Sequence, residues 1–192
     1  MPTDLRIKKS TRALLDASFA VLLNNPHASI SEIANQAGVG RATLYRHYPA
    51  RESLIQALAV ESLSIIGDAL LPIRERGDSG MKAMQGMLQA LLPLAQRYHF
   101  LQMIWTVAEL DRDVWQHYET QVAWVTEWVS QGQIAGEINP ALDVSWVVSV
   151  VDSMLYSASW LIAQEGMSQQ KMLQQMQLTL ATGIAAQAVT AD

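Results

Sequence analysis

The stretch from Arg41 to Arg51 gathers side chains that can recognise nucleic acid. An arginine can donate two hydrogen bonds to guanine O6 and N7, and threonine or alanine can touch the methyl group of thymine. Tyrosine, histidine and arginine can donate to phosphate oxygens, and such contacts position a protein on DNA. The candidate base-reading residues are Arg41, Ala42 and Thr43, and the candidate phosphate contacts are Tyr45, His47, Tyr48 and Arg51.

The elements that must position these residues are two short helices joined by a tight turn, within residues 29–54. Ser29 and Glu32 have the spacing of a capping box, and Gly38 suits the left-handed conformation that ends a helix. The residues that we expect to pack between the two helices are Ile33, Ala34, Ala37, Val39 and Leu44. The base-reading residues then fall near the start of the second helix, the part that enters a major groove in a helix-turn-helix.

Charge is distributed unevenly along the 192 residues. Residues 1–60 hold seven basic and four acidic side chains, a formal charge of +3, whereas residues 61–192 carry −8. This pattern favours a head that meets a polyanion and a body that does not. With no cysteine, the chain has no disulfide, no thiolate metal site and no cysteine nucleophile. The start, MPTDLRIKKSTR, lacks the apolar run of a secretory signal, so we expect a cytoplasmic protein.

The run AGVGRATLYRHYPARESL (37–54) resembles the signature of TetR-family transcriptional regulators. The preceding SISEIANQ and LLDASFAVLL (14–23) are similar to the first two helices of that family's head, and GEINPALDVSWVVSVVDSMLYS (136–157) resembles the entry to its penultimate helix. The resemblance implies a homodimer whose two heads bind a pseudo-palindromic operator. It also implies a ligand-binding body that releases DNA when a small molecule binds, and in most members repression.

Carried over by position, the resemblance assigns base reading to Arg41, Ala42 and Thr43. It assigns phosphate or backbone contacts to Ser31, Tyr45 and His47, and places Arg51 where a lysine is usual. Gly40 and Ala50 depart from the usual capping residues. Alanine is a poor N-cap, costing about 0.5–2 kcal/mol relative to serine or aspartate, so the start of the long helix is open.

The whole chain is predicted to be all-α. We expect a DNA-binding domain over 1–50 and a ligand-binding and dimerisation domain over 51–192, with 51–71 as the linking helix before Pro72. Expected caps are Asp111, Asp143, Ser168 and Gly166. The helices that we expect lie near 5–24, 51–71, 81–98 with a kink at Pro93, 100–108, 112–135, 143–165 and 168–188, and residues 74–80 form the expected loop.

The body is rich in tryptophan and methionine, which suit either a core or a pocket for an apolar or aromatic ligand. The polar candidate that stands apart is Asp152, which lies in an otherwise uncharged helix and requires a partner if buried. That partner could be a cationic ligand, a residue across a dimer or water. The candidate ligand-binding residues are Met84, Met87, Met103, Trp105, Glu109, Tyr118, Trp124, Trp128, Asp152 and Tyr156.

The last two helices carry almost no charge, but Asp152 and the glutamines make them poor membrane spans, so we expect buried or dimer-forming faces. Small residues would allow close approach in a four-helix bundle: Ser149, Ser153, Ser157, Ala158, Ala181, Gly183, Ala185 and Ala186. Asp113 and His117 have i,i+4 spacing, yet helix capping explains the acidic residues more simply, and we expect no metal and no cofactor.

Two other functions remain open from the sequence. The body could respond to a protein partner rather than a small ligand, or the chain could be a helical enzyme. Against an enzyme, the sequence shows no glycine-rich phosphate loop and no nucleophile elbow.

Overall fold

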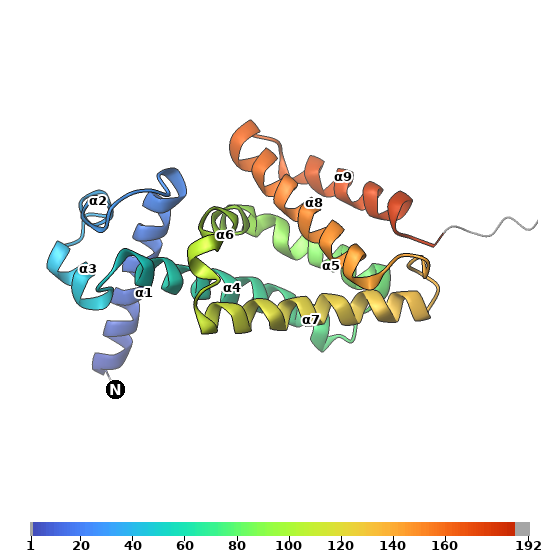
Figure 1. Cartoon of the computed structure of the whole chain (residues 1–192), viewed down its shortest axis with the longest axis horizontal. Coiled ribbons are helices and arrows are strands. Elements are labelled where there is room, and N and C mark those ends of the chain that lie inside the picture. The colour runs from blue at the N-terminus through green and yellow to red at the C-terminus, as the bar shows by residue number, and fades with distance from the viewer. Residues whose placement is uncertain (1, 187–192) are drawn as a thin grey trace, which may run out of the picture. The chain divides into compact units, whose positions relative to one another are not determined.

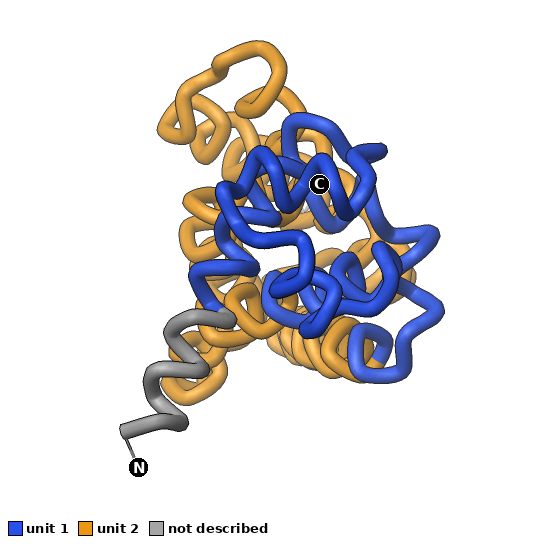
Figure 2. Tube along the Cα trace, turned by 90° about the vertical axis from the view of Figure 1, so that its left-hand side faces the viewer, with its two compact units in different colours: residues 1–62, 100–115 blue, residues 63–99, 116–192 orange. Residues whose placement is uncertain are grey.

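The computed structural model describes the backbone of residues 2–186 and the side chains of residues 12–186, and Figure 1 shows its helices. Within this range every regular element is helical, as predicted, and one backbone bridge joins Ile138 to Ala185. The chain divides into two compact units, shown in Figure 2. We call residues 1–62 and 100–115 the head unit, and residues 63–99 and 116–192 the body unit. The predicted domain boundary at residue 50 stays a prediction.

The head unit contains α1 (Pro2–Asn24), α2 (Ile30–Gln36) and α3 (Arg41–His47). It also contains the first half of α4 (Arg51–Glu75), most of α6 (Ala95–Ala108) and the start of α7 (Arg112–Ile134). Its core holds Leu22, Ile33, Leu44 and Leu54, all fully buried. Phe19 packs edge-to-face on Phe100, with 5.0 Å between the ring centroids.

The body unit contains the rest of α4, α6 and α7, together with α5 (Gly80–Leu91), a short 3-10 helix η1 (Leu92–Leu94), α8 (Val144–Glu165) and α9 (Gln169–Gly183). Helix α9 packs on α5 and α8. The start of α5 meets α7 at Gly80 and Gly132, where a Cβ on Gly132 would lie only 2.7 Å from the Gly80 Cα. Glycine at position 132 is therefore what allows the two backbones to approach.

Three expected boundaries are wrong. Helix α4 does not end before Pro72 but continues to Glu75. Pro72 has no N–H to donate to the carbonyl of Asp68, but both residues are exposed, so water can satisfy that carbonyl. The loop shortens to the residues before Gly80. Pro93 does not kink one long helix. It lies in η1, after which α6 runs unbroken from Ala95.

The last of the three errors is the end of α9, which stops at Gly183 rather than near residue 188. Its backbone then turns to pair with the strand-like segment before α8: Asn139 N donates to Ile184 O at 3.0 Å, and Ala186 N donates to Glu137 O at 2.9 Å. Residues 187 and 188 lie outside the described residues.

Three of the four expected caps are confirmed. Asp111 Oδ1 accepts hydrogen bonds from the backbone N–H of Asp113 and Val114 at 2.9 and 3.1 Å. Ser168 Oγ accepts from Lys171 N at 3.3 Å, and Gly166 is left-handed with φ +66°. Asp143 occupies the N-cap position of α8 without a side-chain hydrogen bond to the helix.

Helices α4 and α8 are each long and apolar enough to cross a membrane by length and composition alone. Their most apolar windows are 44% and 28% buried within this chain. The smaller value shows that much of the apolar window of α8 is not buried by the residues that the structure describes.

Candidate nucleic-acid interface and effector site

The local signals of the helix-turn-helix are confirmed in the head unit. Ser29 N donates to the Glu32 carboxylate at 2.7 Å, and Glu32 N donates to Ser29 Oγ at 3.2 Å, which completes the capping box. The hydrogen bond to Ser29 also lowers the pKa of Glu32. Gly38 adopts φ +67° after α2, and Val39 N donates to Ala34 O at 3.0 Å. These bonds fix the tight turn that leads into α3.

The burial pattern gives α3 an inner and an outer side. Leu44 is fully buried, as are Ile33 and Ala34 of α2, so these three predicted packing residues lie in the core. Ala37 and Val39, which were predicted to pack with them, are only half-buried. Arg41, Ala42, His47 and Tyr45 are exposed, Tyr45 by 45%, whereas Thr43 is half-buried.

Arg46 is also exposed on α3, although the sequence analysis did not select it. Its exposure could have been predicted, because Arg46 lies in the last turn of a short helix whose buried residue is Leu44. With Arg41, it makes the exposed surface of α3 basic, which suits a polyanion.

Ser31 and Tyr48 lie at the edge of this surface, and each is half-buried. Burial and then the charge of Glu61 raise the pKa of Tyr48, so its hydroxyl stays a neutral hydrogen-bond donor at neutral pH. The Tyr48 ring lies 6.3 Å from that of His47, centroid to centroid. Tyr48 therefore packs at the end of α3 as well as presenting a hydroxyl.

Arg51 is half-buried and directed at backbone oxygens of its own chain. Its Nε donates to Ala28 O at 2.9 Å, and its Nη2 donates to Pro26 O. Ala50, the poor cap before α4, is compensated by Ser53, whose hydroxyl donates to Ala50 O at 2.7 Å and accepts from Ala50 N at 3.3 Å. The start of α4 is thus held by side chains that lie outside the usual N-cap position.

In the body unit, Asp152 has a partner within the same chain. The Tyr98 hydroxyl donates to Asp152 Oδ1, and Tyr118 lies near enough for the charge of Asp152 to act on it. Burial is the largest cause that raises the pKa of both tyrosines, followed by that charge. We call Tyr98, Tyr118 and Asp152 the polar cluster; it joins α6, α7 and α8.

The other predicted ligand-binding residues are divided between the two units, and their role in binding stays a prediction. Met84, Met87 and Trp128 are buried in the body core, whereas Tyr156 is 43% exposed. Met103, Trp105 and Glu109 belong to the head unit, where the rings of Trp105 and Trp115 lie 6.5 Å apart.

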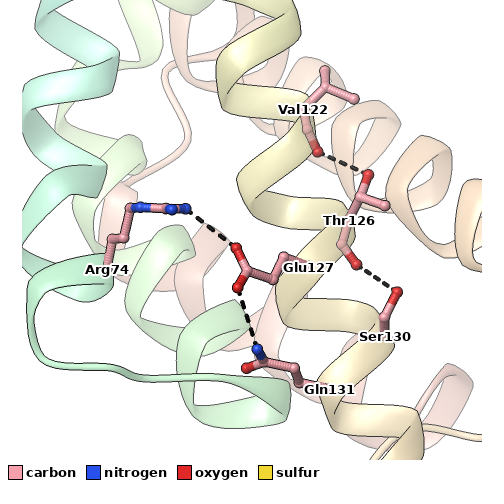
Figure 3. A network of polar contacts seen from close by, with 6 residues as sticks. All are labelled: Arg74, Val122, Thr126, Glu127, Ser130 and Gln131. Atoms are coloured by element: carbon pink, nitrogen blue, oxygen red, sulfur yellow. Dashed lines mark hydrogen bonds and ion pairs between the residues drawn. The ribbon is translucent and has the colours of Figure 1, made fainter.

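Trp124, another predicted ligand contact, is half-buried, and a basic side chain lies over its ring. The Arg74 guanidinium lies 5.3 Å above its ring. Figure 3 shows that Arg74 also reaches Glu127, at 3.2 Å, and that Gln131 donates to the other oxygen of the same carboxylate. This arrangement gives Trp124 a structural contact at the α4–α7 surface.

A groove of about 430 Å³ lies between α8 and α9. The part of α8 that lines the groove continues into an exposed surface of the same helix. Exposed large and small residues follow one another there at spacings of three and four, and we call them the α8 stripe: Trp146, Ser149, Ser153, Tyr156 and Trp160. Ala158, which we expected on this face, is buried in its own chain. The groove floor on α9 includes Met172 and Met176.

Among the described residues, no group of three or more histidine, aspartate or glutamate side chains could hold a metal ion. The site that remains is the head: a helix-turn-helix with a basic, exposed second helix, in a chain whose other elements are helices. This geometry defines the class of helix-turn-helix proteins with a helical body.

The similarity of the head to a known family comes from the sequence. Residues 14–58, which lie in the head unit, match the family model described as "Bacterial regulatory proteins, tetR family". The HTH-type transcriptional repressor LfrR of Mycolicibacterium smegmatis is 48% identical over 52 residues, which are 27% of this chain and 28% of LfrR. The uncharacterized HTH-type regulator YxbF of Bacillus subtilis is 28% identical over 123 residues, 61% of this chain and 32% of YxbF. In these sequence matches the chain spans less than a third of the length of each relative.

Solved structures resemble the chain over most of its length. LfrR from Mycobacterium smegmatis in complex with proflavine has a TM-score of 0.76 at 22% identity, covering 93% of this chain and 98% of LfrR. A regulator from Saccharomonospora viridis in complex with choline has a TM-score of 0.73 at 14% identity, covering 94% of this chain and 100% of that one. At these identities the likeness shows the fold.

Proposed function

We propose that the protein is a DNA-binding transcriptional regulator of the cytoplasm that acts as a homodimer, most simply as a repressor, and leaves its operator when a small molecule binds the body. The observation that carries the DNA-binding part is the exposed surface of α3, where Arg41, Ala42 and Tyr45 point away from the buried Leu44. The match of residues 14–58 to the tetR family model supports the same conclusion.

The test is selection of bound fragments from genomic DNA at about 0.15 M salt, which suppresses non-specific binding. We expect a short pseudo-palindrome, since two recognition helices read two half-sites about 34 Å apart or a multiple of that. Arg41→Ala should weaken operator binding by about 1–3 kcal/mol for each base pair it reads. The matched control is Arg112→Ala, which removes an exposed arginine of α7. Equal effects of the two substitutions would contradict base reading by α3.

The α8 stripe supports dimerisation through α8 and α9. Trp146 and Trp160 are 60% and 41% exposed, an unusual state for tryptophan, and serines lie between them. If two copies of α8 cross antiparallel at Ser153, the serines allow close approach and the tryptophans of one copy lie near those of the other. Ser153→Arg would place two positive charges at the crossing and should give monomers by sedimentation, whereas Ser153→Ala should remain dimeric.

The polar cluster supports a cationic effector, with the carboxylate of Asp152 as its counter-charge. Two regulators of similar fold are described with proflavine and choline, and both molecules are cations at neutral pH. Calorimetric titration with proflavine is the first measurement. We expect Asp152→Asn to weaken binding at least about tenfold, the equivalent of about 1.4 kcal/mol, and Asp143→Asn on the exposed start of α8 to leave it unchanged.

The alternative is a body that responds to a protein partner. The exposed apolar face of α8 is the observation that favours it. A wild-type protein that is monomeric, insensitive to small cations and able to capture a second protein through the α8 stripe would support this alternative over the homodimer.

A further inference from the structure

Arg51 connects two places that are far apart in sequence. Its guanidinium bonds Ala28 O, 23 residues earlier, and Pro26 O, 25 residues earlier. These oxygens belong to the short loop between α1 and α2, which is tightened by a bond from Ala28 N to Asn25 O at 3.0 Å. The next residue, Ser29, is the N-cap of α2.

The two bonds therefore close the helix-turn-helix into a ring. The chain leaves the loop at Ala28, passes through α2 and α3, and returns at Arg51 at the start of α4. Closing a loop of this length removes conformational freedom before any ligand is bound. A recognition helix that is already fixed binds with a smaller entropy cost.

We propose that Arg51 is a positioning residue that holds α2 and α3 in the arrangement required for DNA, and that it does not contact phosphate. This inference rests on the proposed DNA-binding function. Arg51 directs Nε and Nη2 from one planar group to two carbonyls. A lysine, the residue usual at this position by resemblance, has a single nitrogen and cannot reproduce this fork. An ordinary phosphate contact would accept lysine, because it depends on charge.

The experiment compares Arg51→Met, Arg51→Lys and the matched control Arg46→Met, all in the full-length chain. Hydrogen exchange of the amides at residues 28–33 is measured without DNA, and operator affinity is measured across salt concentrations. For Arg51→Met we expect faster exchange there and affinity reduced about tenfold, with the slope of log affinity against log salt unchanged. Arg51→Lys should fail to restore either property.

A phosphate contact gives the opposite result. Loss of one contact in each head lowers the magnitude of the salt slope by about 1.8 per dimer, leaves exchange at residues 28–33 unchanged, and is rescued by lysine. That outcome would overturn the proposal. Arg46→Met should change the affinity or salt slope without changing exchange in the loop. If the wild-type protein binds no DNA, the proposed function fails, while the exchange experiment still decides whether Arg51 holds the loop.

Discussion

The hydrogen bond between Tyr98 and Asp152 can be measured directly, because Tyr98→Phe removes only one hydroxyl. A hydrogen bond to a charged group contributes about 1.5–3 kcal/mol. Asp152 is half-buried, so water can replace part of the lost interaction, and we expect a loss at or below the lower end of that range, about 1–2 kcal/mol. For a chain of this size that lowers Tm by about 2–8 °C.

The assay is a double-mutant cycle by denaturant unfolding, with Tyr98→Phe, Asp152→Ala and the double variant. If the two groups interact as the structure describes, the double variant is more stable than the sum of the single effects predicts, by about 1 kcal/mol. Tyr156→Phe is the control, since this tyrosine lies in the same region of α8 and is 43% exposed. A coupling energy within error of zero, or an equal loss in the control, would refute the assignment of Tyr98 as the partner of Asp152.

Three further predictions concern packing, titration and capping. Gly132→Ala should destabilise the fold by about 1–3 kcal/mol in thermal unfolding, because its Cβ would lie 2.7 Å from the Gly80 backbone. The control Gly86→Ala would place a Cβ at ordinary contact distances and should stabilise α5 by about 0.5–1 kcal/mol in the same measurement. Burial lowers the pKa of His99 in the folded protein, so the unfolded chain binds the proton at higher pH than the folded chain does. Tm should therefore fall as pH drops below the ordinary histidine pKa of about 6.5. His99→Leu should make Tm less dependent on pH in this range. Ser29→Ala should cost about 0.5–2 kcal/mol through loss of the cap of α2, measured by urea unfolding, and a variant as stable as the wild type would show that the capping box contributes little.

The head could be predicted from the sequence because its signals are local. The serine and glutamate of the capping box are three residues apart, Gly38 marks the end of α2 by its own conformational preference, and Leu44 follows the helical period. Each of these depends on neighbours within one or two turns. The exposure of Arg41 and Tyr45 then follows from the burial of Leu44 on the same short helix.

What could not be predicted depends on contacts between distant segments. The carbonyl partners of Arg51 lie 23 and 25 residues away, and Tyr98 and Asp152 are separated by 54 residues. The early end of α9 likewise follows from backbone pairing with residues before α8. Pro72 shows the reverse error, in which a local breaker is overridden because Pro72 and Asp68 are both exposed and water can satisfy the freed carbonyl.

If the α8 stripe forms the proposed homodimer, it has a consequence for related proteins in the same cell. A surface that joins two identical chains must also reject the subunits of related proteins that share the fold, because mixed pairs would carry two different heads to one operator. Tryptophans at both ends, with Ser149, Ser153 and Tyr156 between them, set a size pattern that a relative with large residues at the two serine positions cannot match. The same few side chains would then disfavour mixed dimers with related subunits. Exchanging them could give engineered proteins that pair only with their own copies.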